Sequence, residues 1–234
     1  MMATPQSPTP DLVLHHFPGA CSQVCVFALE HAGLPYALHL VDLKANEQAG
    51  PAYAAVSPLG KVPALVINGT ALTENAAIQV YIAALRPEAG LFPADVSPLA
   101  MARRQAGFSL CGGGLHPIVR GLANPQRITD GDPEGVRRRS IYLAQKTFGH
   151  ANAQLAAAGG WWLGAWSLID VYLHWAVSVA TSAGFDFRSF PELDSLRARL
   201  TALPAFARML EIDTHSAATL ARRHAAAQPL ENTP

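Results

Sequence analysis

The sequence predicts an α/β domain with the element order βαβαββα, followed by an all-helical domain. In the first 85 residues, short apolar stretches of strand type alternate with helical patterns, and Asn68-Gly69 gives a strong hairpin signal. After a proline-rich segment, apolar residues recur with helical spacing. We therefore predict a first domain over 11–86, a linker over 87–98 and an all-helical C-terminal domain over 99–215.

The elements of the first domain follow from local patterns. In chain order we expect a strand at 12–16, a helix at 20–32, a strand at 36–43, a weakly helical stretch at 46–56, a hairpin of strands at 62–67 and 70–72, and a helix at 75–85. Gly33 and Pro35 end the first helix, because glycine accepts the left-handed cap and proline cannot continue a helix. The order is that of a thioredoxin-like domain, whose sites lie at strand ends and helix N-termini.

The second domain is expected to contain helices alone. They are predicted at 99–122, 134–158, 168–183, 192–202 and 204–213, with a loop between the first two. In the third of these helices, Ser167 and Asp170 have the spacing of a capping box, and Trp166 and Val171 that of a hydrophobic staple. We assign this motif a role in folding only. The proline-rich residues 1–10 and the tail 216–234 are expected to be disordered.

Composition narrows the class of protein. The chain has 234 residues, 50% of them hydrophobic and 15% charged, with a formal net charge of zero. This balance argues against a nucleic-acid partner held by bulk electrostatics. The longest apolar stretch, 171–185, is too short and too polar to span a bilayer, which takes about 20 apolar residues. The three cysteines form no disulfide framework, so we expect a cytoplasmic protein, and we expect no metal site.

The segment from Val62 to Asn75 predicts a peptide-binding site. Proline at the start of a strand is unusual because it cannot donate to a neighbouring strand, and a cis Val62–Pro63 bond would account for it. The backbone of Val62 would then face outward and pair with an extended peptide. Glu74 and Asn75 begin a helix, where free N–H groups and the dipole favour a carboxylate. The segment therefore predicts a site for a short peptide with free amino-acid ends.

Cys21 and Ser22 follow Pro18-Gly19 at the start of the first predicted helix. The dipole and free N–H groups of a helix N-terminus favour a thiolate, so Cys21 is a candidate for redox or conjugating chemistry. The alternative is that Cys21 is a small buried hydrophobic residue. Cys25 lies one turn further on, where a packing role is favoured over a role as a resolving cysteine.

These motifs resemble the beta class of bacterial glutathione transferases, and the resemblance covers residues 12–213. It implies that Cys21 lies beside the glutathione sulfur and can form a mixed disulfide with it, with the Ser22 hydroxyl as a second contact. It also implies that His116 reaches the same sulfur across the cleft. Taken alone, a helical histidine is more often a surface or core residue.

The same resemblance assigns the binding residues. Val62, next to Pro63, would pair with the cysteinyl backbone of glutathione. Glu74 would accept from the γ-glutamyl ammonium, while Asn75 and the helix N–H groups would hold the γ-glutamyl carboxylate. Related proteins usually have serine or glycine in place of Asn75.

Other positions also depart from the family pattern. Asn46 stands where the beta class has a lysine near the glycine end, and Lys44 lies two positions earlier. Gly112, Gly113 and Gly114 replace larger polar residues before His116. This glycine run would bend the helix or open room for the second substrate, or it is a locally weak helix without a role.

We therefore expect a homodimeric glutathione transferase that conjugates its co-substrate, glutathione, to a small apolar electrophile between the domains. Two alternatives remain open. One is a glutathione-dependent thiol-disulfide reductase that uses Cys21, and the other is a non-catalytic ligand- or protein-binding module of the same fold. The identity of the electrophile does not follow from any motif.

Overall fold

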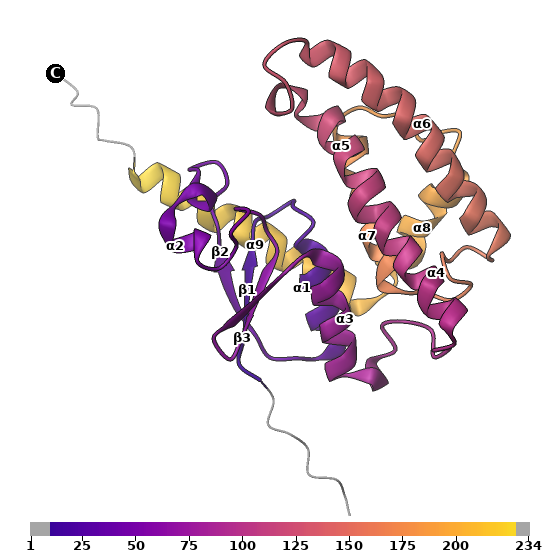
Figure 1. The fold of residues 1–234 in the computed structure, drawn as a ribbon, viewed down its shortest axis with the longest axis horizontal. Helices are drawn as coiled ribbons and strands as arrows, with labels where there is room; N and C mark the ends of the chain where they lie inside the picture. Colours follow the sequence, from indigo (N-terminus) through magenta and orange to yellow (C-terminus); the bar gives the residue numbers. More distant parts are fainter. Residues whose placement is uncertain (1–9, 228–234) are drawn as a thin grey trace, which may run out of the picture.

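The computed structural model describes residues 10–227 and contains a four-stranded mixed sheet followed by helices (Figure 1). The strands are β1 (Leu12–His16), β2 (Ala37–Leu40), β3 (Ala64–Ile67) and β4 (Thr70–Thr73), in the spatial order β2-β1-β3-β4. β1 pairs in parallel with β2, and the β1–β3 and β3–β4 pairs are antiparallel. This arrangement confirms the predicted fold class.

Three α-helices complete the first domain: α1 (Gln23–Ala32), α2 (Pro51–Ala54) and α3 (Asn75–Leu85). The helix predicted at 20–32 begins later than expected, with Ser22 as its N-cap, and it ends at Gly33 with φ 60°. The weakly helical stretch at 46–56 consists of a short 3₁₀ turn and α2. Pro51 begins α2 because its fixed φ suits the first helical turn.

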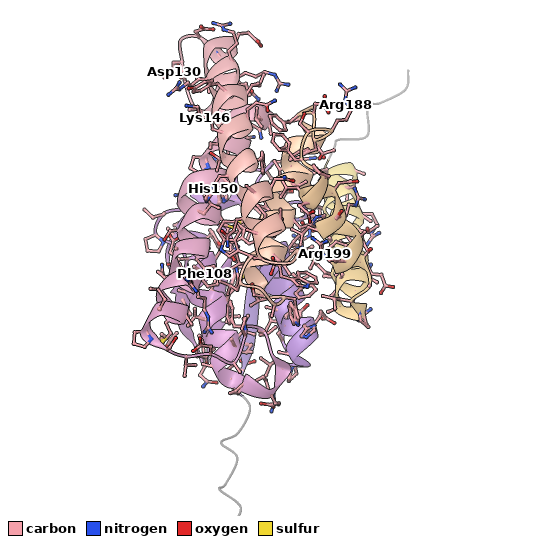
Figure 2. The ribbon with its side chains drawn as sticks, turned by 90° about the vertical axis from the view of Figure 1, so that its right-hand side faces the viewer. Phe108, Asp130, Lys146, His150, Arg188 and Arg199 are labelled. Atoms are coloured by element: carbon pink, nitrogen blue, oxygen red, sulfur yellow. The ribbon has the colours of Figure 1, made fainter. Side chains whose placement is uncertain are left out.

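The second domain is a bundle of helices. Its members are α4 (Pro98–Ser109), α5 (His116–Ala123), α6 (Pro133–Ala157), α7 (Leu168–Ser182), α8 (Pro191–Thr201) and α9 (Pro204–Ala227). Figure 2 shows Asp130 near the tip of the hairpin between α5 and α6, with Lys146 and His150 further along α6. None of the helices described between residues 10 and 227 is long and apolar enough to cross a membrane. The exact domain limits remain a prediction.

A π-helical segment, Leu110–Leu115, joins α4 to α5, so that the helix predicted at 99–122 is one rod with a widened turn. The N–H of His116 bonds to the carbonyl of Cys111, five residues back. Pro117 has no N–H, and its ring would crowd the carbonyl four residues earlier in a regular α-helix. The wider turn accommodates this proline and sets the position of His116.

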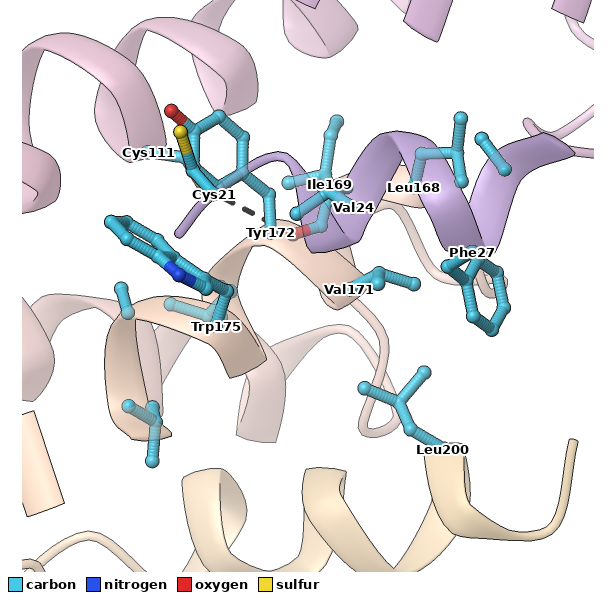
Figure 3. Close-up of a cluster of buried hydrophobic side chains, with 14 of the residues drawn as sticks. Cys21, Val24, Phe27, Cys111, Leu168, Ile169, Val171, Tyr172, Trp175 and Leu200 are labelled. Carbon is cyan, nitrogen blue, oxygen red and sulfur yellow. Dashed lines mark hydrogen bonds between the residues drawn. The ribbon is translucent and has the colours of Figure 1, made fainter. Parts of the chain in front are cut away.

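Helix α7 lies at the centre of the molecule, where it packs against α1 of the first domain (Figure 3). Its capping box is present: the N–H and hydroxyl of Ser167 both donate to Asp170 Oδ2, at 2.8 and 3.0 Å. The N–H of Trp162 donates to the other carboxylate oxygen at 2.8 Å. Because Ser167 and Asp170 are fully buried, these bonds satisfy groups that have no access to water.

Helix α9 is longer than the sequence analysis expected. It continues to Ala227 instead of ending near residue 213, which corrects the expectation of disorder for residues 216–227. Helix α9 packs against α1 of the first domain (Figure 1). Ser216 and Leu220 are buried there, and His224 forms an ion pair with Asp42. The remaining segments expected to be disordered, 1–9 and 228–234, lie outside the described residues.

Candidate active site

A cavity of 260 Å³ lies between the two domains. Six of the seven predicted site residues line it: Cys21, Val62, Pro63, Glu74, Asn75 and His116. The other lining residues are Ser57, Pro58, Leu59, Lys61, Thr73, Gly112, Pro117 and Tyr172. The structure thus brings together residues from the first domain with residues of the α4–α5 rod and α7.

The wall formed by Val62 and Pro63 is held by the loop before it. The Val62–Pro63 bond is cis, as predicted. Ser57 Oγ donates to the carbonyl of Lys61 at 2.9 Å and accepts from its N–H at 3.1 Å. Gly60 has φ 59°, and a Cβ there would lie only 2.8 Å from the carbonyl oxygen of Gln48. Glycine is therefore required for this loop to deliver Val62 to the cavity.

Glu74 lies in a conformation that is unusual for a residue with a side chain. Its φ is 71°, and it is the N-cap of α3. Strained backbone of this kind is often retained at binding sites. The first N–H groups of α3 and the positive end of its dipole lie next to this carboxylate, on the wall of the cavity. The cavity therefore has an acceptor for a cation beside donors for an anion.

The role expected for the Asn75 side chain needs correction. Its Nδ2 donates to the carbonyl of Cys21 at 2.7 Å, and its Oδ1 accepts from Gln79 and from the thiol of Cys25. The residue is only 6% exposed. The side chain thus ties α3 to the Cys21 turn, and the backbone N–H is the part of Asn75 suited to an anionic ligand.

Cys21 lies at the cavity wall, with its Sγ 3.7 Å from the carbonyl oxygen of Val62. Burial raises the pKa of its thiol to about 11, against smaller opposing effects from Asn75, Arg120 and Tyr172. The expectation that the helix N-terminus makes this group a thiolate is therefore wrong, because desolvation outweighs it. Cys21 is a protonated thiol at neutral pH.

Ser22 and Cys25 do not line the cavity. Ser22 is fully buried, with its Oγ 2.8 Å from Nδ1 of His16. Cys25 is also fully buried, and burial raises the pKa of its thiol well above the ordinary value. We therefore remove Ser22 from the candidate site, and the geometry favours packing for Cys25.

His116 extends from the start of α5 into the cavity wall. Burial lowers the pKa of its imidazole to about 4, with further lowering by the charges of Arg120 and Lys61. The ring is therefore neutral at pH 7, with one nitrogen that donates and one that accepts. Its centroid lies 4.6 Å from that of the Trp175 ring, which fixes the position of the imidazole.

Among the lining residues that sequence reasoning missed, Tyr172 and Lys61 bear most directly on the chemistry. Tyr172 lies in the second turn of α7, and burial raises the pKa of its phenol far above the ordinary value, so that its hydroxyl stays a donor. Lys61 is exposed and lines the cavity, whereas Lys44 and Asn46 do not. Adjacency to Val62 could have indicated Lys61, but no local motif identifies Tyr172.

Comparisons with known proteins agree with this geometry. Residues 19–85 match the family description "Glutathione S-transferase, N-terminal domain". The chain is 31% identical over 195 residues to the glutathione S-transferase GST-4.5 of Xanthomonas campestris, covering 81% of this chain and 92% of that protein.

Two solved structures resemble the whole fold. A glutathione transferase homologue from Sulfitobacter, with bound glutathione, has a TM-score of 0.78 and 28% identity, covering 86% of this chain and 97% of that one. The bacterial beta-class glutathione S-transferase of Sphingomonas chungbukensis has a TM-score of 0.76 and 28% identity, covering 86% and 98%. This protein therefore belongs to the glutathione S-transferase family, and its fold resembles that of a beta-class member.

Proposed function

We propose that this protein is a glutathione transferase that binds glutathione as its co-substrate and conjugates the thiol to a small apolar electrophile between the domains. One observation carries the proposal: a single cavity joins Val62, Glu74 and the N-terminus of α3 with Cys21 and His116. Val62, Glu74 and the N-terminus of α3 suit the backbone and the γ-glutamyl end of a peptide. Cys21 and His116 suit its sulfur.

Each polar group of glutathione has a counterpart on the cavity wall. The backbone of Val62 pairs with the cysteinyl residue, as a strand edge pairs with an extended peptide. The Glu74 carboxylate accepts from the γ-glutamyl ammonium, and the N–H groups at the start of α3 hold the adjacent carboxylate. Lys61 is the cation placed to hold the glycyl carboxylate, in place of the residue expected at Asn46.

The proposed chemistry uses neutral donors to stabilise a thiolate. Cys21 is a protonated thiol and Tyr172 a protonated phenol, so both donate to the glutathione sulfur, and the neutral ring of His116 donates to the Tyr172 hydroxyl and orients it. The sulfur attacks the electrophile, an S–C bond forms, and the leaving group departs with its electron pair. With its pKa of about 4, His116 does not keep the thiol proton at neutral pH, and the proton passes to water.

The electrophile occupies the apolar end of the cavity. Pro58, Leu59 and Pro117 line it, and Gly112 leaves space beside the hydroxyl of Tyr172, which lies 3.6 Å from the position a Cβ would take. A small apolar compound with a leaving group fits this surface. Such chemistry suits detoxification.

We also propose that the protein is a cytoplasmic homodimer. Val96, Leu99 and Met101 lie within six residues of one another and are 70%, 60% and 55% exposed. Clustered exposed apolar side chains of this kind suit an interface between two copies of the chain. All three cysteines are free thiols, which suits a reducing compartment.

Conjugation is favoured over thiol-disulfide exchange because Cys21 is protonated and Cys25 is buried away from the cavity. The test compares turnover of an aryl halide with turnover of a mixed disulfide of glutathione, in the wild type and in Cys21→Ala. We expect the aryl halide to be the better substrate and to be turned over, more slowly, by the variant. If only the disulfide were turned over, and Cys21→Ala abolished that turnover, the protein would be a thiol-disulfide reductase. If the protein failed to bind immobilised glutathione, the remaining alternative would be a non-catalytic binding module.

A further inference from the structure

We propose that Asp213 of α9 is a positioning residue for the turn that carries Cys21; this inference rests on the proposed active site. The turn, residues 17–22, connects β1 to α1. Asp213 lies 194 residues from Gly19 in the sequence, yet its carboxylate contacts this turn. Two sets of contacts support the inference, one at Gly19 before Cys21 and one at Ser22 after it.

The first set holds Gly19, two residues before Cys21. Asp213 Oδ1 accepts a hydrogen bond from the N–H of Gly19 at 3.0 Å. The indole N–H of Trp175 donates to the carbonyl of the same glycine at 3.1 Å. Gly19 has φ 77°, a conformation that other residues rarely adopt. Both polar backbone groups of Gly19 are thus held by side chains of the helical domain.

The second set reaches the other end of the turn through His16. Asp213 Oδ1 lies 3.4 Å from Nε2 of His16, whose Nδ1 lies 2.8 Å from the hydroxyl of Ser22. That hydroxyl lies 3.3 Å from the backbone N–H and from the carbonyl of Phe17. His16 and Ser22 are fully buried; their contact with each other is a hydrogen bond, whereas the approach of His16 Nε2 to Asp213 is not one. The Asp213 carboxylate thus holds the turn before Cys21 by a hydrogen bond to Gly19, and it approaches the turn after Cys21 through His16 and Ser22.

The location of these contacts explains why they matter for the sulfur. None of Asp213, His16 and Ser22 lines the cavity, so they act on Cys21 only through the backbone of the turn. Groups that orient a reactive side chain from behind are needed to hold it within a fraction of an ångström. A displacement of about 1 Å in such a site lowers the rate by roughly 100-fold.

Helix α9 also supplies a matched control. Arg208 lies one to two turns before Asp213 and forms an ion pair with Glu30 of α1 at 3.5 Å. That pair also joins α9 to the first domain, but Arg208 contacts no residue of the turn through any ion pair or hydrogen bond among residues 10–227. Arg208→Ala thus weakens the docking of α9 without releasing Gly19.

The test measures the alkylation rate of Cys21 by iodoacetamide, assigned by peptide mass mapping, in the wild type, Asp213→Ala, Asp213→Asn and Arg208→Ala. We expect Asp213→Ala to raise this rate about fivefold or more and to weaken glutathione binding by roughly tenfold, because the turn loosens. Asp213→Asn keeps an acceptor for the Gly19 N–H, so its alkylation rate should lie between those of Asp213→Ala and the wild type. Arg208→Ala should match the wild type.

Equal alkylation rates in Asp213→Ala and Arg208→Ala would overturn the inference. If Asp213→Ala does not fold, Asp213→Asn takes its place in the comparison. An alkylation rate of Cys21 in Asp213→Asn equal to that in Arg208→Ala would then overturn the inference. The alkylation readout needs no glutathione. A wild-type protein that fails to bind glutathione would therefore refute the proposed function, while the comparison of alkylation rates would still decide the role of Asp213.

Discussion

The hydroxyl of Tyr172 lies 3.3 Å from Nδ1 of His116, on the wall of the cavity that also holds Cys21. The two residues come from α7 and from the α4–α5 rod, and the contact brings two neutral donors to one point. The pKa of His116 is lowered to about 4 and that of Tyr172 is raised, so neither group carries charge at neutral pH. The pair therefore suits hydrogen bonding to a thiolate rather than proton storage.

Tyr172→Phe should weaken the hydrogen-bond stabilisation of the bound glutathione thiolate without disturbing the core. Loss of a hydrogen bond to a charged group is worth about 1.5–3 kcal/mol, so we expect kcat/KM for conjugation to fall by roughly 10- to 100-fold. The pKa of the bound glutathione thiol should rise in the same variant. Tyr142→Phe is the matched control, because Tyr142 is 47% exposed on α6. Unchanged kcat/KM and thiol pKa in Tyr172→Phe would exclude the proposed role.

Glu74→Gln should weaken glutathione binding by removing the carboxylate that faces the γ-glutamyl ammonium. We expect the Kd measured by calorimetry to rise about 10- to 100-fold, the equivalent of one charge-assisted hydrogen bond. Glu74→Gly should bind as weakly but be more stable than Glu74→Gln by about 1 kcal/mol, because glycine relieves the positive φ. Glu88→Gln is the control, since Glu88 pairs with Arg86 away from the cavity. An unchanged Kd in Glu74→Gln would remove Glu74 from the site.

Several features of the fold were predictable because they depend on neighbouring residues. Asn75 and Leu85 bound α3 as expected, the Asn68-Gly69 hairpin is present, and the Val62–Pro63 bond is cis. The features that were missed depend on contacts between distant segments. The high pKa of Cys21 results from burial between α1 and α7, and the length of α9 results from its contact with the first domain through His224. No local pattern reports such burial.

Ser167→Ala should destabilise the fold without changing the site. The Ser167 hydroxyl is fully buried and bonds to Asp170, so we expect a loss of about 1–2 kcal/mol in the free energy of unfolding. The melting temperature should fall by roughly 2–8 °C for a chain of this size. Ser97→Ala removes the N-cap hydroxyl of α4, which is exposed, and should cost less. Equal melting temperatures for Ser167→Ala and the wild type would refute the capping role.

Stability should fall on acidification. Burial lowers the pKa values of His15, His116 and His174 to about 4, from an ordinary 6.5. The unfolded chain therefore binds more protons between pH 6.5 and 4, and stability present above pH 6.5 is lost as the pH falls through this range. Burial raises the pKa of the Asp170 carboxyl to about 6, so this group alone would increase stability as the pH falls. Because three histidines act against this one carboxyl, the net effect of acidification is a loss of stability.

Urea unfolding of the wild type and of His174→Gln between pH 7.5 and 4.5 checks this expectation. His174 is only 8% exposed and lies outside the cavity, and replacing it should reduce the acid-induced loss by about 2 kcal/mol. Identical pH dependence in the two proteins would show that His174 does not carry a lowered pKa.

In the proposed mechanism, this cavity binds glutathione and ionises its thiol through neutral donors. The most direct measurement is an ultraviolet titration of the thiolate of glutathione bound to the wild-type protein, with the buried thiol of Cys21 recorded in the ligand-free protein as reference. We expect saturable binding, a pKa of the bound glutathione thiol at least about one unit below the ordinary thiol value near 8.5, and no Cys21 thiolate at neutral pH. An unshifted glutathione pKa, or a Cys21 thiolate already present at neutral pH, would contradict it.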